Sequence, residues 1–304
     1  MSTDHRSIVL ASLAADALAL GAHWIYDTQQ IDEQIGRANA LRAPLPTSFH
    51  TTKRRGDLTH YGDQTLLMLR FLAETDRFDG NLFARMWQDF FADYSGYRDH
   101  ASRETLQRLE EGHPPEEAGS TSSDLGGAAR IAPLVYRYGE DEETLLAAAR
   151  QQTTLTHRNP DVVDSAAFFA RVAVSVLQGL DPLAALQDVV QHHFNRPPFD
   201  RWVAQGIESS GVKTRDAIKQ FGQACDVAAA FPGVIHLIAK YQDEPRTGLI
   251  ENVMAGGDSA ARGLILGMIF GASSGMESVS QDWVMNLNEL PRIESYLERL
   301  SQTW

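Results

Sequence analysis

Cysteine is almost missing from this sequence of 304 residues. The single cysteine, Cys225, has no partner for an internal disulfide, so nothing in cysteine usage indicates a secreted protein. The run around it, residues 224–230, is mostly small and apolar. That setting favours Cys225 as a small buried hydrophobic residue over a nucleophile.

Positive charge is also scarce. The chain carries 27 lysines and arginines against 40 acidic residues, which gives a formal net charge of −13. The cluster at residues 53–55, Lys-Arg-Arg, is too short for a surface that follows a phosphate backbone, so we expect no nucleic-acid partner. A small anionic ligand is still compatible with the sequence, because helix N-termini and a few arginines can hold one.

Hydrophobic runs are too short to cross a membrane. Residues 8–20 are nearly all apolar, but Asp16 interrupts them and the run falls short of a bilayer span. Asp4 and Arg6 precede it, so the positive segment of a signal peptide is weak. We therefore expect a buried helix in a cytoplasmic protein with no membrane partner.

Strand patterns are few, since no run rich in Val, Ile and Thr alternates cleanly into a hairpin turn. Apolar residues recur instead at helical spacing. The helices predicted from spacing and start signals cover residues 8–20, 65–71, 81–94, 124–138, 160–180, 182–194, 199–209, 224–241, 258–273 and 290–300. No repeat or shift in composition marks a boundary, so the sequence predicts an all-α protein with one domain over residues 1–304.

Three glycines recur at every fourth position of the predicted helix 258–273. They are Gly263, Gly267 and Gly271, in a segment that is otherwise apolar. Because glycine costs a helix roughly 1 kcal/mol per residue, the repeat indicates a stripe where another helix approaches closely.

Charged residues within such apolar segments must be paired, hydrogen-bonded or metal-bound. Asp16, Asp258 and Arg262 are the three examples. For Asp258, and for Asp63 after Gly62, a helix cap is the alternative interpretation, since each follows glycine and precedes an apolar run.

Five segments together resemble the ADP-ribosylglycohydrolase family, and they occur in the family's order. They are Ala-Asp-Ala-Leu at residues 15–18, Tyr-Gly-Asp-Gln-Thr-Leu-Leu-Met at 61–68, Ser-Asp-Leu-Gly-Gly at 123–127, Thr-His at 156–157 and Gly-Gly-Asp-Ser at 256–259. The resemblance implies a single-domain orthogonal helical bundle. It also implies cleavage of a glycosidic bond of an ADP-ribose-like small-molecule ligand, with two Mg²⁺ ions between the acidic segments.

Carried over position by position, the resemblance suggests a candidate site. The residues are Asp63, Asp258 and His23 for catalysis, Ser123, Gly126, Gly127, His157 and Arg262 for ligand binding, and Asp63, Gln64 and Asp258 for a metal.

The chain departs from the family's metal ligands, however. Gly62 replaces a ligand threonine, Gln64 an aspartate, Ala260 an aspartate and Ala261 a threonine. The two-magnesium site is therefore disfavoured. A single Mg²⁺ held by Asp63, Gln64 and Asp258 is an alternative, because oxygen ligands suit that ion.

Arg262 suggests what replaced the metal. It follows Asp258 by four residues, so both lie on one face of the predicted helix. We hypothesise that its guanidinium pairs with Asp258, with Asp63 as a further candidate partner, and occupies the space of a Mg²⁺ ion. The alternative is an Arg262 side chain that extends into solvent.

Three histidines are the remaining candidates. His23 stands where the family often has glutamate, so it is either an acid or base, or a structural residue beside Trp24. His157 matches a position near the family's ligand, and we expect His60 at a loop surface or one layer behind the site.

Two functions follow. The first is a divergent glycosyl hydrolase with an altered metal site. The second is an inactive ligand-binding or structural protein, since the family also includes lens crystallins of jellyfish.

Overall fold

The computed structural model describes residues 5–75 and 77–302. Within these ranges it contains helices and two isolated β-bridges but no strand, so the all-α prediction is confirmed. The α-helices are α1 (Arg6–Ala19), α2 (Thr28–Gln34), α3 (His60–Thr75), α4 (Gly80–Ala92), α5 (His100–Glu110), α6 (Pro115–Ala118), α7 (Ala132–Tyr138), α8 (Glu142–Thr156), α9 (Pro160–Leu177), α10 (Pro182–His193), α11 (Phe199–Glu208), α12 (Thr214–Phe221), α13 (Val227–Tyr241), α14 (Pro245–Met254), α15 (Ser259–Ser274), α16 (Gln281–Met285) and α17 (Leu290–Ser301).

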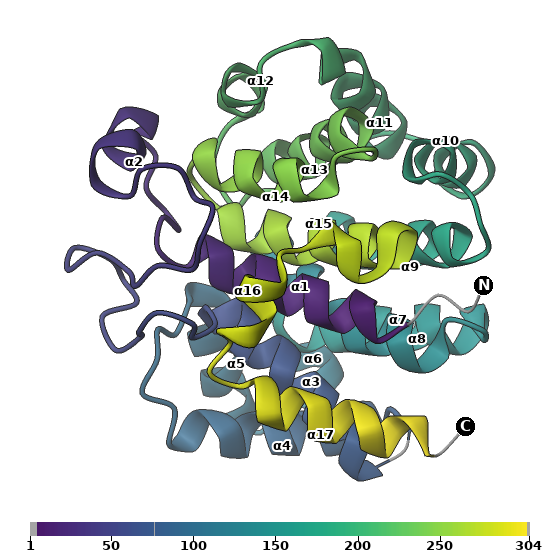
Figure 1. Ribbon diagram of the computed structural model, residues 1–304. Helices are drawn as coiled ribbons and strands as arrows, with labels where there is room; N and C mark the ends of the chain where they lie inside the picture. Colours follow the sequence, from purple (N-terminus) through teal and green to yellow (C-terminus); the bar gives the residue numbers. More distant parts are fainter. Residues whose placement is uncertain (1–4, 76, 303–304) are drawn as a thin grey trace.

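Helices α1 and α15 lie side by side at the centre of the bundle, although they come from opposite ends of the chain (Figure 1). Helices α10 to α14 lie on one side of this pair, and α3, α4, α5 and α17 lie on the other. The buried apolar side chains form one continuous core through these layers. No helix of the described residues is long and apolar enough to cross a membrane.

The glycine stripe of α15 faces the backbone of α1, as the sequence predicts. A Cβ atom on Gly267 would lie 2.3 Å from the Ala11 carbonyl oxygen, and one on Gly271 would lie 2.5 Å from that of Ser7. The Ser12 hydroxyl also donates to the Leu264 carbonyl oxygen at 2.8 Å. Only hydrogen at the glycine Cα atoms permits this approach, which fixes Asp258, the residue before α15, relative to the end of α1.

The predicted helix over residues 124–138 is broken. Two short 3₁₀ turns, Leu125–Gly127 and Ala129–Ile131, precede α7, and Arg130 has the non-helical angles φ −90° and ψ 21°. A Cβ atom on Gly126 would lie 2.1 Å from the Tyr61 ring. A contact with a distant helix therefore sets the backbone here, and local spacing could not reveal it.

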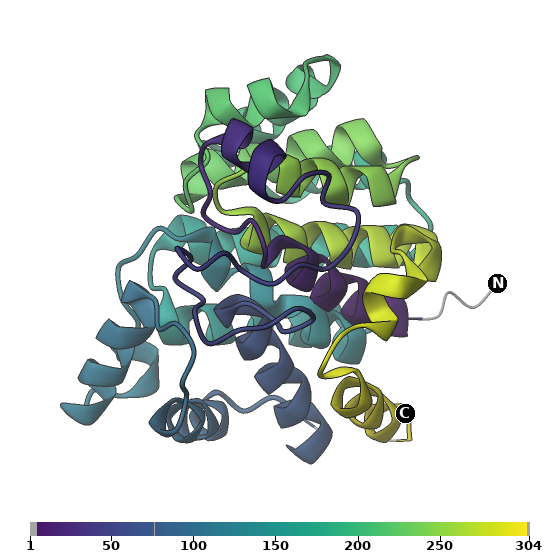
Figure 2. The same cartoon turned by 60° about the vertical axis from the view of Figure 1, so that its left-hand side comes forward.

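A long segment without helix connects α2 to α3. Figure 2 shows it crossing in front of α1 and α3. Backbone contacts tie it to the C-terminal part of the chain, since Trp283 Nε1 donates to the Asn39 carbonyl oxygen and Asn288 N donates to that of Gly56. The segment carries His50 into the interior, where this side chain is fully buried.

Candidate functional site

His23 and Asp258 meet where the end of α1 approaches the start of α15. Both side chains are fully buried, and His23 Nε2 lies 3.6 Å from Asp258 Oδ1. The Nδ1 atom of His23 accepts from the Ala260 backbone N–H at 3.4 Å. This contact is longer than an ordinary hydrogen bond, so it does not fix which ring nitrogen carries the proton.

The turn that delivers His23 is constrained. Trp24 has φ 64°, and it is the one non-glycine residue with positive φ among the described residues. Its N–H donates to the Gly257 carbonyl oxygen at 2.9 Å, and its ring stacks on His23 with centroids 4.4 Å apart. A non-glycine residue held in this conformation is typical of functional sites.

Neither oxygen of the Asp258 carboxylate makes a hydrogen bond of good geometry to the described residues, although the Ala261 N–H and the Trp24 indole N–H lie near enough to lower its pKa. Asp258 stands at the N-cap position of α15, but its side chain makes no cap hydrogen bond of good geometry, so capping explains this residue only in part. Burial raises the pKa of Asp258 well above its ordinary value, with a further contribution from the negative charge of Asp124, and Arg262 opposes the shift. A carboxyl group with a raised pKa keeps its proton to higher pH than a free one, which is the property that a proton donor needs.

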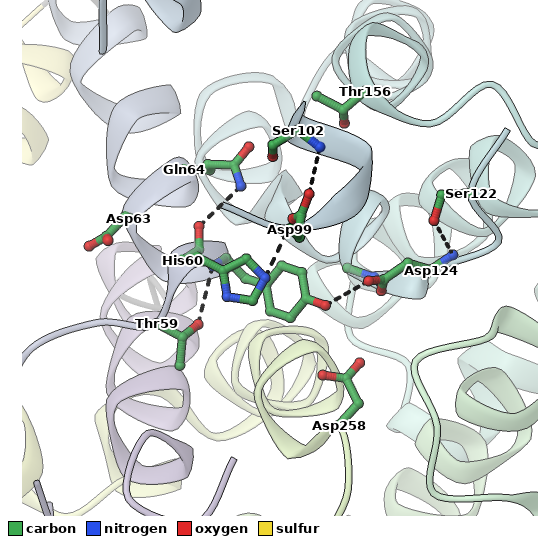
Figure 3. Close-up of polar contacts among 12 residues, drawn as sticks. Thr59, His60, Asp63, Gln64, Asp99, Ser102, Ser122, Asp124, Thr156 and Asp258 are labelled. Atoms are coloured by element: carbon green, nitrogen blue, oxygen red, sulfur yellow. Dashed lines mark hydrogen bonds and ion pairs between the residues drawn. The ribbon is translucent and has the colours of Figure 1, made fainter. Parts of the chain in front are cut away.

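Asp124 is the second carboxylate of the site. It accepts hydrogen bonds from the Tyr61 hydroxyl at 2.7 Å and from the Gly126 backbone N–H at 2.7 Å. Burial, followed by the charge of Asp99, raises the pKa of Asp124 to about 6. Figure 3 shows the Asp258 carboxylate near Asp124, whose charge acts on it. Two carboxyl groups with different pKa values therefore face one space.

Two more histidines pack beside His23. His50 Nε2 lies 3.1 Å from His60 Nδ1, and His60 Nε2 lies 3.4 Å from Asp99 Oδ2. Burial lowers the pKa of His50 and of His60 to about 3, so both rings are neutral near pH 7. His60 is 1% exposed as the first residue of α3, so its expected place at a loop surface is wrong.

A cavity of about 430 Å³ opens above His23. Aromatic side chains form much of its wall, and no lysine or arginine contributes to it. The lining residues are Gly21, His23, Trp24, Ile25, Tyr26, Asp27, Gln30, Leu45, Thr47, Ser48 and Phe49. A wall of this kind suits an uncharged ring that stacks on aromatic faces better than a pyrophosphate group.

Asp63 lies apart from this cavity. Its Oδ2 atom accepts from Lys53 Nζ and from the Tyr94 hydroxyl, both at 2.5 Å, and it lines a separate cavity of about 400 Å³ with those two residues. In Figure 3 its carboxylate points away from the space between Asp124 and Asp258. The structure therefore brings His23 to Asp258 but does not bring Asp63 to either.

The chain does not fit the family's two Mg²⁺ ions. The Gln64 Oε1 atom already accepts from Trp87 Nε1 and from an Arg130 nitrogen. Gly62 has no room for an oxygen-bearing side chain, because a Cβ atom there would lie 2.2 Å from Asp16 Oδ2. The Gln64 side-chain oxygen already accepts two hydrogen bonds, and Asp63 is ion-paired with Lys53. These oxygen atoms therefore do not surround a common position where Mg²⁺ could bind.

Arg262 is fully buried, which excludes a side chain that extends into solvent. The hypothesis of a direct pair with Asp258 also needs correction. Its Nε donates to Asn252 Oδ1 at 2.9 Å and one terminal nitrogen donates to the Gly256 carbonyl oxygen at 2.6 Å, whereas no contact within ion-pair distance joins it to Asp258. Burial lowers the pKa of Arg262 to about 10, so it stays charged. The positive charge of Arg262 opposes the rise in the pKa of Asp258. Its hydrogen bond to the Gly256 carbonyl oxygen holds the turn that precedes Asp258.

The four predicted ligand-binding residues of the middle segments shape the site in different ways. Ser123 donates to Asp226 Oδ2 at 2.5 Å and ties its loop to the start of α13. Gly126 and Gly127 allow close approach, since a Cβ atom on Gly127 would lie 2.5 Å from the His157 ring. His157 is buried, with Nδ1 2.8 Å from Thr156 Oγ1 and no hydrogen-bond partner for Nε2 among the described residues.

Sequence reasoning missed four residues that the structure places at the site: Tyr61, Asp99, Asp124 and His50. Tyr61 and Asp124 lie inside segments that carry the family resemblance, so position alone could have suggested them. Asp99 precedes α5 and caps it through the Ser102 N–H, which looks like an ordinary helix start. His50 lies on a segment without periodicity, and no sequence signal indicates its burial.

Comparison with known proteins agrees with this architecture. The family model described as ADP-ribosylglycohydrolase matches residues 5–304. The chain belongs to the ADP-ribosylglycohydrolase family. A solved structure titled ADP-ribosylglycohydrolase-related protein complex shares the fold of this family member with a TM-score of 0.71 and 20% identity, covering 99% of this chain and 98% of the other.

Curated relatives of this ADP-ribosylglycohydrolase-family chain include two proteins named crystallins. Crystallin J1A of Tripedalia cystophora is 22% identical over 98% of this chain and 96% of its own length. Crystallin J1B of the same organism is 22% identical over 92% of this chain and 90% of its own length. The low identities fit a divergent member of the family.

Proposed function

We propose that the chain hydrolyses a glycosidic bond through the buried carboxyl group of Asp258 and the partly buried carboxyl group of Asp124, without the family's two Mg²⁺ ions. The observation that carries the proposal is the Asp258 carboxylate, which is fully buried, makes no hydrogen bond of good geometry to the described residues and lies 3.6 Å from His23 Nε2. A structural carboxylate in such a position normally has partners, so this one is held for a ligand or a reaction.

The division of labour follows from the two pKa shifts. Asp258 has the more strongly raised pKa and donates its proton to the leaving-group atom as the bond from that atom to the anomeric carbon breaks. Asp124, with a pKa of about 6, is ionised at neutral pH and accepts a proton from the water whose oxygen attacks the anomeric carbon. The Tyr61 hydroxyl holds Asp124 in place.

The substrate class comes from the family and from the cavity. ADP-ribose-like compounds fit the family, and the aromatic wall formed by Trp24, Tyr26 and Phe49 suits the uncharged sugar end of such a compound. Because no lysine or arginine lines this cavity, a pyrophosphate group would lie outside it.

The test is release of the sugar product from N- and O-linked ADP-ribosyl peptides, followed by chromatography with and without added Mg²⁺. We expect turnover without Mg²⁺ and a loss of about 100-fold or more in kcat for Asp258→Asn. Asp63→Asn is the matched control, because Asp63 lines the other cavity, and it keeps its activity. Turnover that requires Mg²⁺ and is lost equally in both variants would overturn the proposal.

A second candidate function is a structural, crystallin-like protein. The names of the two curated relatives favour it, since both are crystallins matched over nearly the whole chain. The strong negative charge also favours solubility at high concentration. Calorimetric titration with ADP-ribose separates the two functions, because a crystallin-like protein binds no nucleotide and turns over no glycoside.

A further inference from the structure

Three buried histidines lie close together beside the cavity, which only His23 among them lines, and they come from separate parts of the chain. His23 follows α1, His50 belongs to the long segment before α3, and His60 begins α3. Each offers one ring nitrogen, and these nitrogens all lie within 4.8 Å of one another. Among the described residues, these three histidines are the set of histidine, cysteine or acidic side chains whose ligand atoms lie close enough together to hold one metal ion.

The spacing is close to that of a tetrahedral metal site. Zinc–nitrogen bonds of about 2.0–2.1 Å place two ligand nitrogens about 3.3–3.4 Å apart. His50 Nε2 and His60 Nδ1 are 3.1 Å apart, slightly nearer than that spacing. The 4.8 Å limit for the whole group means that a ring movement of about 1 Å closes the site.

Hydrogen bonding within the protein leaves these rings incompletely satisfied. His23 Nε2, His50 Nδ1 and His60 Nε2 are buried without a hydrogen-bond partner among the described residues. The pKa values of all three histidines are lowered by burial, so near pH 7 the rings are neutral, the form that binds metal. Of these nitrogens, His60 Nε2 has Asp99 Oδ2 at 3.4 Å, so the nitrogens of His50 and His60 that would bind the metal are the facing pair, Nε2 and Nδ1.

Two carboxylates flank the trio. Asp99 Oδ2 lies 3.4 Å from His60 Nε2, the arrangement in which an acid orients a metal-binding imidazole through its other nitrogen. Asp258 Oδ1 lies 3.6 Å from His23 Nε2. The negative charge of Asp99 compensates part of the charge of a buried divalent cation, and the cavity that His23 lines gives the ion an entry path.

We propose that His23, His50 and His60 bind one divalent transition-metal ion of the Zn²⁺ class, with a fourth position open to water beside Asp258. Imidazole nitrogens favour zinc, cobalt and nickel over magnesium. Three protein nitrogens with one open position are typical of a zinc site that is accessible to a ligand. The site differs in ligands from the acidic segments at residues 61–68 and 256–259, and it does not rest on the proposed hydrolysis.

The experiment measures metal uptake by the untagged full chain in the absence of any substrate. Zn²⁺ affinity comes from competition with a chromogenic chelator, and the visible spectrum of bound Co²⁺ reports coordination number. We expect one Zn²⁺ per chain, a four-coordinate Co²⁺ spectrum and no displacement by Mg²⁺. Affinity falls by more than about 100-fold in His50→Gln and in His60→Gln, and by about 10- to 100-fold in Asp99→Asn.

The matched control is His157→Gln, which removes another buried histidine of the site that is not in the trio, and we expect its Zn²⁺ affinity to equal that of the original chain. His192→Gln tests uptake at an exposed helix end. If the histidine variants do not fold, X-ray absorption of the zinc-loaded original chain still counts the imidazole ligands, and three are expected.

Several results overturn the site: no stoichiometric Zn²⁺ uptake, equal affinity in His50→Gln, loss of binding in His192→Gln alone, or displacement by Mg²⁺. Because none of these measurements uses a substrate, failure of the metal site and failure of the proposed hydrolysis are distinguishable.

Discussion

His23 Nε2 lies 3.6 Å from Asp258 Oδ1, and neither side chain is exposed to solvent. The imidazole and the carboxyl group come from opposite ends of the chain and are held together by the packing of α15 on α1. The carboxylate gains little from this position, because it makes no hydrogen bond of good geometry to the described residues. A buried group that lowers the stability of the fold is expected at a position where function requires it.

Asp258→Ala is expected to leave the free energy of unfolding at pH 8 unchanged or to raise it by up to about 2 kcal/mol, because a buried carboxylate without partners is removed. The sign follows from the raised pKa of Asp258, since its contribution to stability is present below pH 3.8 and is lost as pH rises toward the folded value. The gain is therefore larger at pH 8 than at pH 5. Urea unfolding at the two pH values measures it.

The control for this variant is Asp141→Ala. Asp141 caps α8 through the Thr144 N–H, so its loss is expected to cost about 1 kcal/mol. A cost of the same size for Asp258→Ala would show that Asp258 is a helix cap after all.

Arg262→Met is expected to lower the free energy of unfolding by about 2–4 kcal/mol. The variant leaves Asn252 Oδ1 and the Gly256 carbonyl oxygen without their buried donor. Arg37→Met is the comparison, since Arg37 forms an ion pair with Glu251 from a side chain that is 51% exposed, and such pairs contribute at most about 1 kcal/mol. Thermal unfolding of both variants checks the difference, and equal losses would contradict the structural role of Arg262.

Gly62→Ala is expected to destabilise the fold by about 2–4 kcal/mol. The new Cβ atom would lie 2.2 Å from Asp16 Oδ2, and Asp16 is itself held by Thr59 N at 2.7 Å and Thr59 Oγ1 at 2.6 Å. Gly211→Ala meets no atom within 4 Å and stays within about 1 kcal/mol of the original chain. A stable Gly62→Ala protein with unchanged melting temperature would show that Asp16 can move.

In His157→Gln, the free energy of unfolding is expected to fall less as pH decreases below 7 than it does in the original chain. Burial lowers the pKa of His157 to about 3 from 6.5, so its contribution is present above pH 6.5 and is lost as pH falls toward 3. Between pH 7 and pH 4.5 the original chain should lose about 2–3 kcal/mol more than the variant. Exposed His192 gives the control, because His192→Gln should leave the profile unchanged, and parallel profiles for His157→Gln would refute the expectation.

The sequence alone determined the class of fold and several of its details. Apolar spacing located most long helices, and Asn159-Pro160 marked the start of α9, where the Asn159 side chain accepts from the Asp161 and Val162 N–H groups. The glycine repeat of α15 indicated a close helix partner. These features are local, or repeat at a fixed interval, so each is readable without knowing what lies across the core.

The sequence pattern did not predict the helices of polar composition, among them α5 and α12. Each buries only a narrow face against the bundle, so its apolar signal is weak, and tertiary packing stabilises it. The 3₁₀ turns before α7 were missed for the same reason, because the Tyr61 ring decides the backbone at Gly126.

For the site, the sequence supplied Asp258 and His23 and showed that the family's metal ligands are replaced. Only the tertiary structure decided which residues share a space: Asp63 turns to Lys53, Arg262 turns to Asn252, and His50 and His60 join His23. The physical reason is that a charge or an imidazole takes its pKa and its partners from groups distant in sequence. Burial and proximity across the core are set by how helices pack, and no spacing along the chain encodes them.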